Sequence, residues 1–230
     1  MFEALVSCLP LAVFGRFAQT VSLIQQSRIG IVIPDLLLGL WPASRPVVAR
    51  QRSSGVESHI IALLEREQSL SDAQIMRRLH LTEEINRRSL KTLLRRGAIV
   101  ECSTQRYELA DHARTADIEL VAVEVKLRRW RDALYQAKTY LAFANHAFVV
   151  LDGNQVNATP TLIEAFREAT VGLFLQRGDT LALAVEAGRN RPVSSTRVRA
   201  VDALFGLRSQ PGTVRSREDD VKIPRNLAIS

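Results

Sequence analysis

The sequence predicts an α/β protein whose mixed sheet, flanked by helices, is built from both ends of the chain. Three observations lead to this prediction: apolar β-branched runs near the N-terminus, helical periodicity over 56–97, and a strand–helix–strand pattern over 118–152. The chain has 230 residues, enough for one large domain or two small ones. Its 47% hydrophobic and 24% charged residues are typical of a globular protein.

Residues 1–50 are expected to supply the first part of this core. We expect a helix over about 2–14, followed by two strands over 17–26 and 29–38, because both runs are apolar and rich in β-branched residues. Residues 41–55 are rich in Pro, Ser and Arg, which is typical of a linker.

Residues 51–112 are expected to form an inserted helical unit. A first helix covers 57–67, and Ser71 and Thr82 are suitable N-caps for a second and a third. Gly97 is suited to a left-handed helix end, and two short strands follow it. Four apolar residues of the third helix are expected to face the core: Ile85, Leu90, Leu93 and Leu94.

This order of helix, helix, turn, helix, glycine and hairpin resembles the winged helix-turn-helix family over about 56–110. In that family the third helix enters the major groove of DNA. The resemblance therefore implies a DNA-binding surface on this helix and on the wing. The candidate DNA-binding residues are Asn86, Arg87, Lys91, Arg95 and Arg106.

Two features of this surface support different interpretations. Arg87, Lys91 and Arg95 follow one another at a spacing of four and form a basic stripe along the third helix. Glu83 and Glu84 offset part of that charge, and winged helices also bind proteins, so a solvated face is the alternative.

Residues 113–205 are expected to form the second part of the core, and the polar, basic tail over 206–230 is expected to be flexible. Thr159 and Pro160 are typical first residues of a helix. The expected elements are a strand over 118–127, a helix over 131–144, a strand over 146–152, a helix over 159–170 and a hairpin over 171–187.

The strand over 118–127 carries an acid and a lysine on one side. Side chains alternate along a strand, so its valines face one way, and Glu124 and Lys126 face the other. Charged side chains on a buried strand are costly unless they are paired. This pair therefore needs a structural or a functional explanation.

At this strand the sequence resembles the PD-(D/E)XK, or restriction-endonuclease-like, nuclease superfamily. The resemblance includes the family's E-x-K strand, its Pro-Asp, its Q-x-x-x-Y helix and an acid in its first helix. The matching residues are, in that order, Glu124 to Lys126, Pro34 with Asp35, Gln136 with Tyr140, and Glu3.

The chain departs from the family where the aspartate and the E-x-K strand are usually joined by a short hairpin. Here Asp35 and Glu124 are separated by the winged-helix segment, which we interpret as an insertion into the hairpin turn. Asp117 is the competing acid, but it lies an odd number of residues before Glu124 and would face away on a continuous strand.

The resemblance implies metal-assisted hydrolysis of phosphodiester bonds in DNA, with Mg²⁺ or Mn²⁺ as the cofactor. Asp35, Glu124 and the Val125 carbonyl would hold the ion. Lys126 would orient the attacking water or stabilise the charged transition state. Two further catalytic candidates are Glu3 and Gln136. Glu3 would complete the shell of ligands or water around the metal, and Gln136 would position Lys126 or the substrate.

Simpler interpretations remain for these residues. Glu124 and Lys126 are also consistent with a salt bridge on an exposed edge strand, and Glu3 with an acid that caps the first helical turn. The alternative function is a catalytically inactive DNA-binding or protein-interaction protein that uses the nuclease fold as a scaffold.

Charge and cysteine content point to partners and compartment. A net charge of +7 favours a polyanionic partner such as duplex or branched DNA, although a codon bias toward arginine has the same effect. A homodimer or a protein partner is left open. With only Cys8 and Cys102, no signal-peptide pattern and no apolar run of membrane length, we expect a cytoplasmic protein without membrane contact.

Overall fold

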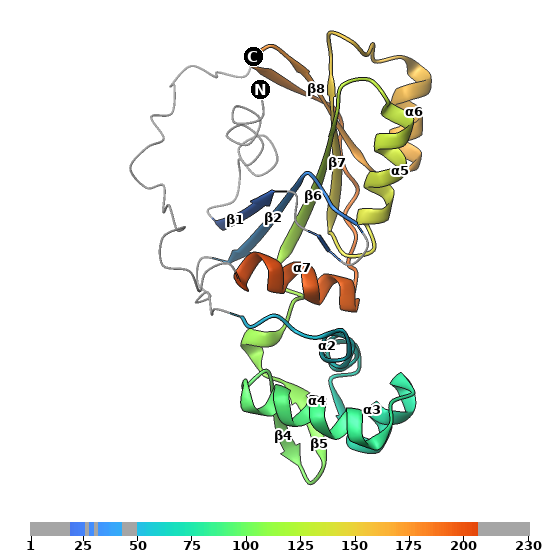
Figure 1. Cartoon of the computed structure of the whole chain (residues 1–230). Coiled ribbons are helices and arrows are strands. Elements are labelled where there is room, and N and C mark those ends of the chain that lie inside the picture. Colours follow the sequence, from blue (N-terminus) through green and yellow to red (C-terminus); the bar gives the residue numbers. More distant parts are fainter. Residues whose placement is uncertain (1–18, 26–27, 30–31, 43–49, 207–230) are drawn as a thin grey trace.

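The chain folds as an α/β protein with a mixed sheet flanked by helices and a second, smaller antiparallel sheet (Figure 1). The computed structural model describes residues 19–25, 28–29, 32–42 and 50–206. The expected helix over 2–14 lies outside the described residues, as does nearly all of the expected tail over 206–230. No helix in the described part of the chain has the length and apolar character needed to cross a membrane.

The larger sheet has the strand order β1-β2-β6-β7-β8-β9 and combines both ends of the described chain. Its central strands β6, β7 and β8 are parallel, whereas β1, β2 and β9 are each antiparallel to their neighbours. The strands are β1 (Gln19–Gln25), β2 (Leu36–Pro42), β6 (Glu119–Lys126), β7 (His146–Asp152), β8 (Gly172–Arg177) and β9 (Thr180–Val185).

The second strand begins later than the sequence pattern predicts. The expected strand over 29–38 is replaced by an isolated bridge between Ile29 and Val32 and by β2, which continues into the expected linker as far as Pro42. Pro34 has no backbone N–H to donate to a ladder, which is consistent with regular pairing beginning only after it.

Three helices, α5 (Trp130–Tyr140), α6 (Pro160–Glu168) and α7 (Ser195–Gly206), pack against one face of this sheet. Leu120 and Ala122 of β6 face them, whereas the alternate residues of β6 belong to a separate buried cluster on the other face. The alternation predicted for this strand is therefore present in the structure.

Between β2 and β6 the chain forms a smaller unit with its own core (Figure 1). Its three-stranded sheet has the order β3-β5-β4. Two residues expected in its core, Ile85 and Leu94, are instead 45% and 37% exposed, because the core side of the third helix is narrower than predicted. The elements are α2 (Gly55–Glu67), β3 (Ser69–Ser71), α3 (Asp72–Leu79), α4 (Glu83–Arg95), β4 (Ile99–Ser103), β5 (Arg106–Leu109) and a 3₁₀ turn, η1 (Asp111–Ala113).

Helix α7, which the sequence pattern did not predict, joins the two units (Figure 1). Val198 belongs to the core of the smaller unit, whereas Leu204 packs in the core of the larger sheet. Two charged residues of α7, Arg197 and Asp202, are both 2% exposed. These buried charges interrupt the apolar periodicity by which a helix is recognised in a sequence.

Candidate active site

The first and last parts of the chain meet where β2 begins beside β6. The antiparallel register pairs Leu36 with Val123, so the next residue of each segment, Asp35 and Glu124, come opposite one another. The Val125 N–H donates a 2.8 Å hydrogen bond to Asp35 Oδ2. The structure thus brings Asp35 beside Glu124, although nearly ninety residues separate them in the sequence.

Glu124 is buried and has a partner for each carboxylate oxygen. Its side chain is 2% exposed, and Oε1 lies 2.7 Å from Lys126 Nζ. Oε2 accepts a 2.5 Å hydrogen bond from the Tyr140 hydroxyl. Since β6 lies between β2 and β7, it is not an edge strand, so the edge-strand interpretation considered from the sequence is wrong; Glu124 is buried, whereas Lys126 reaches solvent.

Tyr140 is part of this cluster, although it was not among the site residues predicted from the sequence. It lies at the end of α5 and is 2% exposed. Burial raises the pKa of the Tyr140 hydroxyl, and its hydrogen bond to Glu124 raises the pKa further. Tyr140 therefore stays a hydrogen-bond donor, and the Q-x-x-x-Y spacing was the sequence signal for it.

Lys126 links the buried cluster to solvent. The hydrogen bond that Lys126 donates to Glu124 raises the pKa of Lys126, burial opposes this, and the charges of Glu124 and Asp35 add to the increase. The Lys126 side chain is 37% exposed, and it lines an open hollow of about 590 Å³ together with Gln136 of α5. The ammonium group of Lys126 can therefore contact a molecule that enters the hollow from solvent.

Gln136 and Tyr140 lie one turn apart on α5 but have different environments. Tyr140 is buried against Glu124, whereas Gln136 is exposed and faces the hollow next to Lys126. Gln136 is thus placed to contact a bound molecule or Lys126. The fourth catalytic candidate, Glu3, lies outside the described residues.

The donor set of this cluster suits a hard cation such as Mg²⁺, which prefers carboxylate and carbonyl oxygens. Asp35 and Glu124 supply two carboxylates, and Lys126 supplies one ammonium group, so the formal charge of the three is −1. In the described part of the chain no group of three or more His, Cys, Asp or Glu side chains forms a metal site. A cation here would take its other ligands from the Val125 carbonyl, water and substrate.

The competing acid, Asp117, lies elsewhere. It is exposed in the turn before β6, two residues ahead of the first residue of that strand. Asp35, in contrast, adjoins the E-x-K segment and accepts a hydrogen bond from the Val125 N–H.

The basic stripe expected on α4 is exposed to solvent. Arg87, Lys91 and Arg95 are all exposed, and Arg87 lies 4.0 Å from Glu83. Arg106, at the start of β5, is also exposed, but its guanidinium donates to the Ser69 carbonyl oxygen at 3.2 Å. Arg106 is thus held against β3.

Asn86 is the one DNA-binding candidate that the structure removes from the surface. Its side chain is 1% exposed and donates to the carboxylate of Asp72, which joins α3 to α4. A side chain buried between two helices cannot reach a base edge, so the prediction that Asn86 contacts DNA is wrong. Its polar character is explained by this interhelical hydrogen bond.

The exposed stripe on α4 and the carboxylate cluster lie in different parts of the molecule. Lys126 ends β6 at the end of the larger sheet remote from the smaller unit, whereas α4 lies within that unit (Figure 1). Comparisons with protein-family models, curated proteins and solved structures found no match to this chain.

Proposed function

We propose that this protein is a metal-dependent DNA nuclease that hydrolyses phosphodiester bonds at the Asp35–Glu124–Lys126 cluster. The observation that supports this proposal best is the meeting of Asp35 with the Glu124–Lys126 pair on adjacent strands. Two carboxylates and a lysine beside an open hollow match the arrangement expected from the resemblance to PD-(D/E)XK nucleases.

In this proposal Asp35, Glu124 and the Val125 carbonyl hold Mg²⁺ or Mn²⁺. The ion, when bound, lowers the pKa of a water molecule and neutralises charge on the phosphate. Tyr140 fixes the orientation of Glu124 by donating to Oε2, and Oε1, which accepts from Lys126, has a second lone pair with which it could also bind the cation.

Lys126 stabilises the negative charge that develops on the reacting phosphate. Its ammonium group carries three N–H donors, of which one is directed at Glu124. The others can donate to non-bridging phosphate oxygens as negative charge builds up on them, which is where a fixed cation lowers the barrier most. The raised pKa keeps Lys126 protonated during this step.

The smaller unit binds duplex DNA in this proposal. Its order of helices and strands is that of a winged helix-turn-helix, and α4 presents three exposed cations along one side. In Figure 1, α4 lies far from the end of β6 that carries Lys126. One DNA molecule must therefore extend along both units, or the smaller unit must select DNA at a distance from the bond that is cleaved.

A second candidate is a DNA-binding protein that does not cleave. It is favoured by the fact that both oxygens of Glu124 are already engaged by Lys126 and Tyr140 of this same chain. In that case the ion pair only stabilises the sheet, and the exposed cations of α4 carry the function. The two candidates make opposite predictions for a cleavage assay.

The test is cleavage of supercoiled, linear, branched and single-stranded DNA by the purified chain with Mg²⁺ or Mn²⁺. We expect Lys126→Ala to lower the cleavage rate by about 10²-fold or more while DNA binding is retained. Lys138→Ala, which removes an exposed lysine of α5 that does not line the hollow beside Lys126, is the matched control and is expected to leave the rate unchanged.

Asp35→Asn provides an independent variant, because it keeps the size of the side chain and removes one of the two carboxylates. We expect it to abolish cleavage and to weaken Mn²⁺ binding in a metal titration. If the wild-type chain cleaves none of these DNA forms with either ion, or if Lys126→Ala cleaves as fast as wild type, the nuclease proposal is wrong.

A further inference from the structure

Large apolar side chains are exposed next to the residues of the candidate active site. Ile33, which precedes Pro34 and Asp35, is 53% exposed; Leu127, which follows Lys126, is 54% exposed. Tyr135, which precedes Gln136, is 74% exposed, the largest exposure among the described large hydrophobic side chains. Of these three residues, Tyr135 and Leu127 each line a hollow that Lys126 also lines.

We infer that the DNA strand cleaved by this protein enters the site unpaired and that one of its bases stacks on Tyr135. The inference rests on the proposed nuclease function and adds to it the form of the substrate. It identifies Tyr135 as a substrate-binding residue that acts beside the cluster of Asp35, Glu124 and Lys126.

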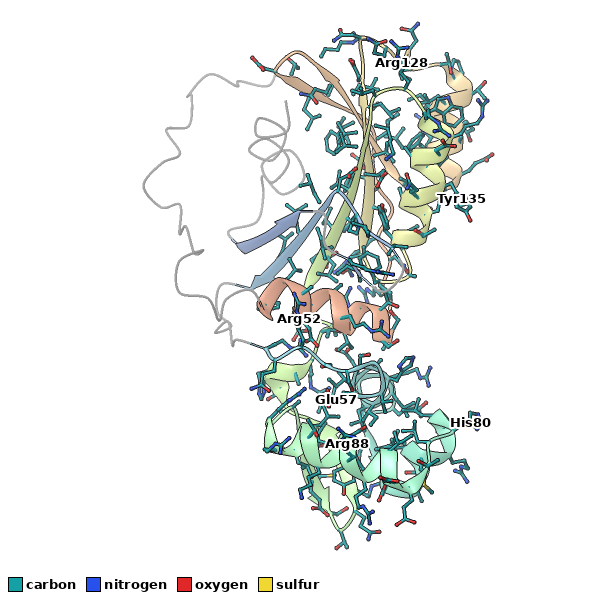
Figure 2. All side chains as sticks on the ribbon, viewed as in Figure 1. Arg52, Glu57, His80, Arg88, Arg128 and Tyr135 are labelled. Atoms are coloured by element: carbon teal, nitrogen blue, oxygen red, sulfur yellow. The ribbon has the colours of Figure 1, made fainter. Side chains whose placement is uncertain are left out.

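Tyr135 borders the same hollow as Lys126. The hollow of about 590 Å³ beside Lys126 is lined by Lys126, Arg129, Asp132, Tyr135 and Gln136. The aromatic ring and the active-site lysine thus border the same open space. Figure 2 shows Tyr135 projecting from the outer side of α5, where its side chain is open to solvent.

Positively charged side chains surround the hollow beside Lys126. A neighbouring hollow of about 520 Å³ is lined by Leu127, Arg128 and Arg129 together with Lys126, and Arg128 lies at the end of the sheet remote from α2 (Figure 2). Arg129 pairs with Asp132 yet is 83% exposed, so it can still meet a phosphate. Lys126 and Arg129 line both hollows, and with Arg128 they outnumber the two acids there, Asp132 and Asp152, so the space beside the ring offers cations to a nucleic-acid backbone.

Paired and unpaired bases present different surfaces to an aromatic side chain. In a duplex the base faces are covered by stacking, and only edges and phosphates are presented to a protein. An unpaired strand exposes the flat faces of its bases, and these stack on aromatic side chains with little dependence on sequence. An exposed tyrosine that borders the same hollow as Lys126 and Arg129 fits such a strand better than it fits a duplex.

The test measures binding of a short labelled single-stranded DNA and of the duplex of the same sequence, by fluorescence anisotropy in EDTA, which prevents cleavage. We expect Tyr135→Ala to weaken single-strand binding about tenfold, equivalent to about 1.4 kcal/mol, and to leave duplex binding unchanged. Tyr135→Phe keeps the aromatic face and is expected to bind as wild type does. Leu183→Ala removes another exposed apolar side chain, 48% exposed on β9, and is the matched control.

The outcomes separate this inference from the nuclease proposal. Equal binding of the single strand by Tyr135→Ala and wild type, or equal losses for single strand and duplex, overturns the inference even if the protein cleaves DNA. A failure of the wild-type chain to cleave any DNA overturns the nuclease proposal, while a selective loss in Tyr135→Ala would still assign Tyr135 to an unpaired strand. Tighter binding of single-stranded RNA of the same sequence overturns the choice of DNA.

Discussion

Glu119 begins the strand that carries Glu124 and Lys126, and it provides a quantitative test of how that strand is held. Its carboxylate accepts hydrogen bonds from His146 Nε2 at 2.9 Å and from Arg189 at 2.9 and 3.0 Å. Burial alone would raise the pKa of Glu119, but these hydrogen bonds and the charges of Arg189 and His146 outweigh burial and lower the pKa to about 2.

The magnitude follows from this pKa. A change from 4.5 to about 2 corresponds to about 3 kcal/mol, since each pKa unit is worth about 1.4 kcal/mol. Arg189 is 54% exposed, so solvent screening lowers the expected contribution to about 2 kcal/mol. Because the folded-state pKa is depressed, this stability is present above the ordinary pKa of 4.5 and is lost as the pH falls toward 2.

The assay is urea-induced unfolding of the wild type and of Glu119→Gln, followed by circular dichroism at about pH 6 and about pH 2. We expect the variant to be about 2 kcal/mol less stable at the higher pH and nearly as stable as wild type at the lower pH. Glu164→Gln, at an exposed ion pair on α6, is expected to change stability by less than about 0.5 kcal/mol at either pH. If the free energies of unfolding of wild type and Glu119→Gln differ by the same amount at both pH values, the reasoning is refuted.

Two further predictions concern Arg197 in α7 and the exposed cations of α4. Arg197 is buried and donates to the carbonyl oxygens of three residues and to an amide oxygen, so Arg197→Met is expected to lower the free energy of unfolding by about 3–5 kcal/mol; an unchanged urea midpoint would contradict this. In the proposed DNA-binding role of α4, Arg87 and Lys91 each contact a phosphate, so the double variant Arg87→Ala, Lys91→Ala is expected to weaken duplex binding and to reduce the slope of log K against log salt by about 2. A double variant of Lys138 and Arg167 in the larger unit loses the same charge, and an equal change in its slope would argue against α4 as the contact surface.

Local signals in the sequence were sufficient to predict most elements of the smaller unit and of the sheet. Capping residues predict the starts of α3 and α4, and Ser71 and Thr82 are indeed their N-caps. Strict alternation predicts that Glu124 and Lys126 share a face of β6. These features depend on neighbours within a few residues, which is why a sequence records them.

Other features depend on contacts between distant segments, and the sequence patterns misplaced or missed them. Asn86 has the character of a surface residue, yet its amide is buried because Asp72 of another helix accepts its hydrogen bond. Helix α7 was not predicted, because Arg197 and Asp202 occupy positions where an apolar residue is expected and are stabilised only by partners far along the chain.

By itself, the sequence determined the periods of the strands and helices, the caps that start them and the pairing of an acid with a lysine on one side of a strand. The resemblance predicted that Asp35 and Glu124 meet, but the register that brings them together, the hydrogen bond from Tyr140 to Glu124 and the exposure of Tyr135 at the hollow beside Lys126 were decided by the tertiary structure. The physical reason is that periodicity and capping are set by covalent neighbours, whereas the register of β2 against β6 and the burial of α5 are set by packing across the whole sheet.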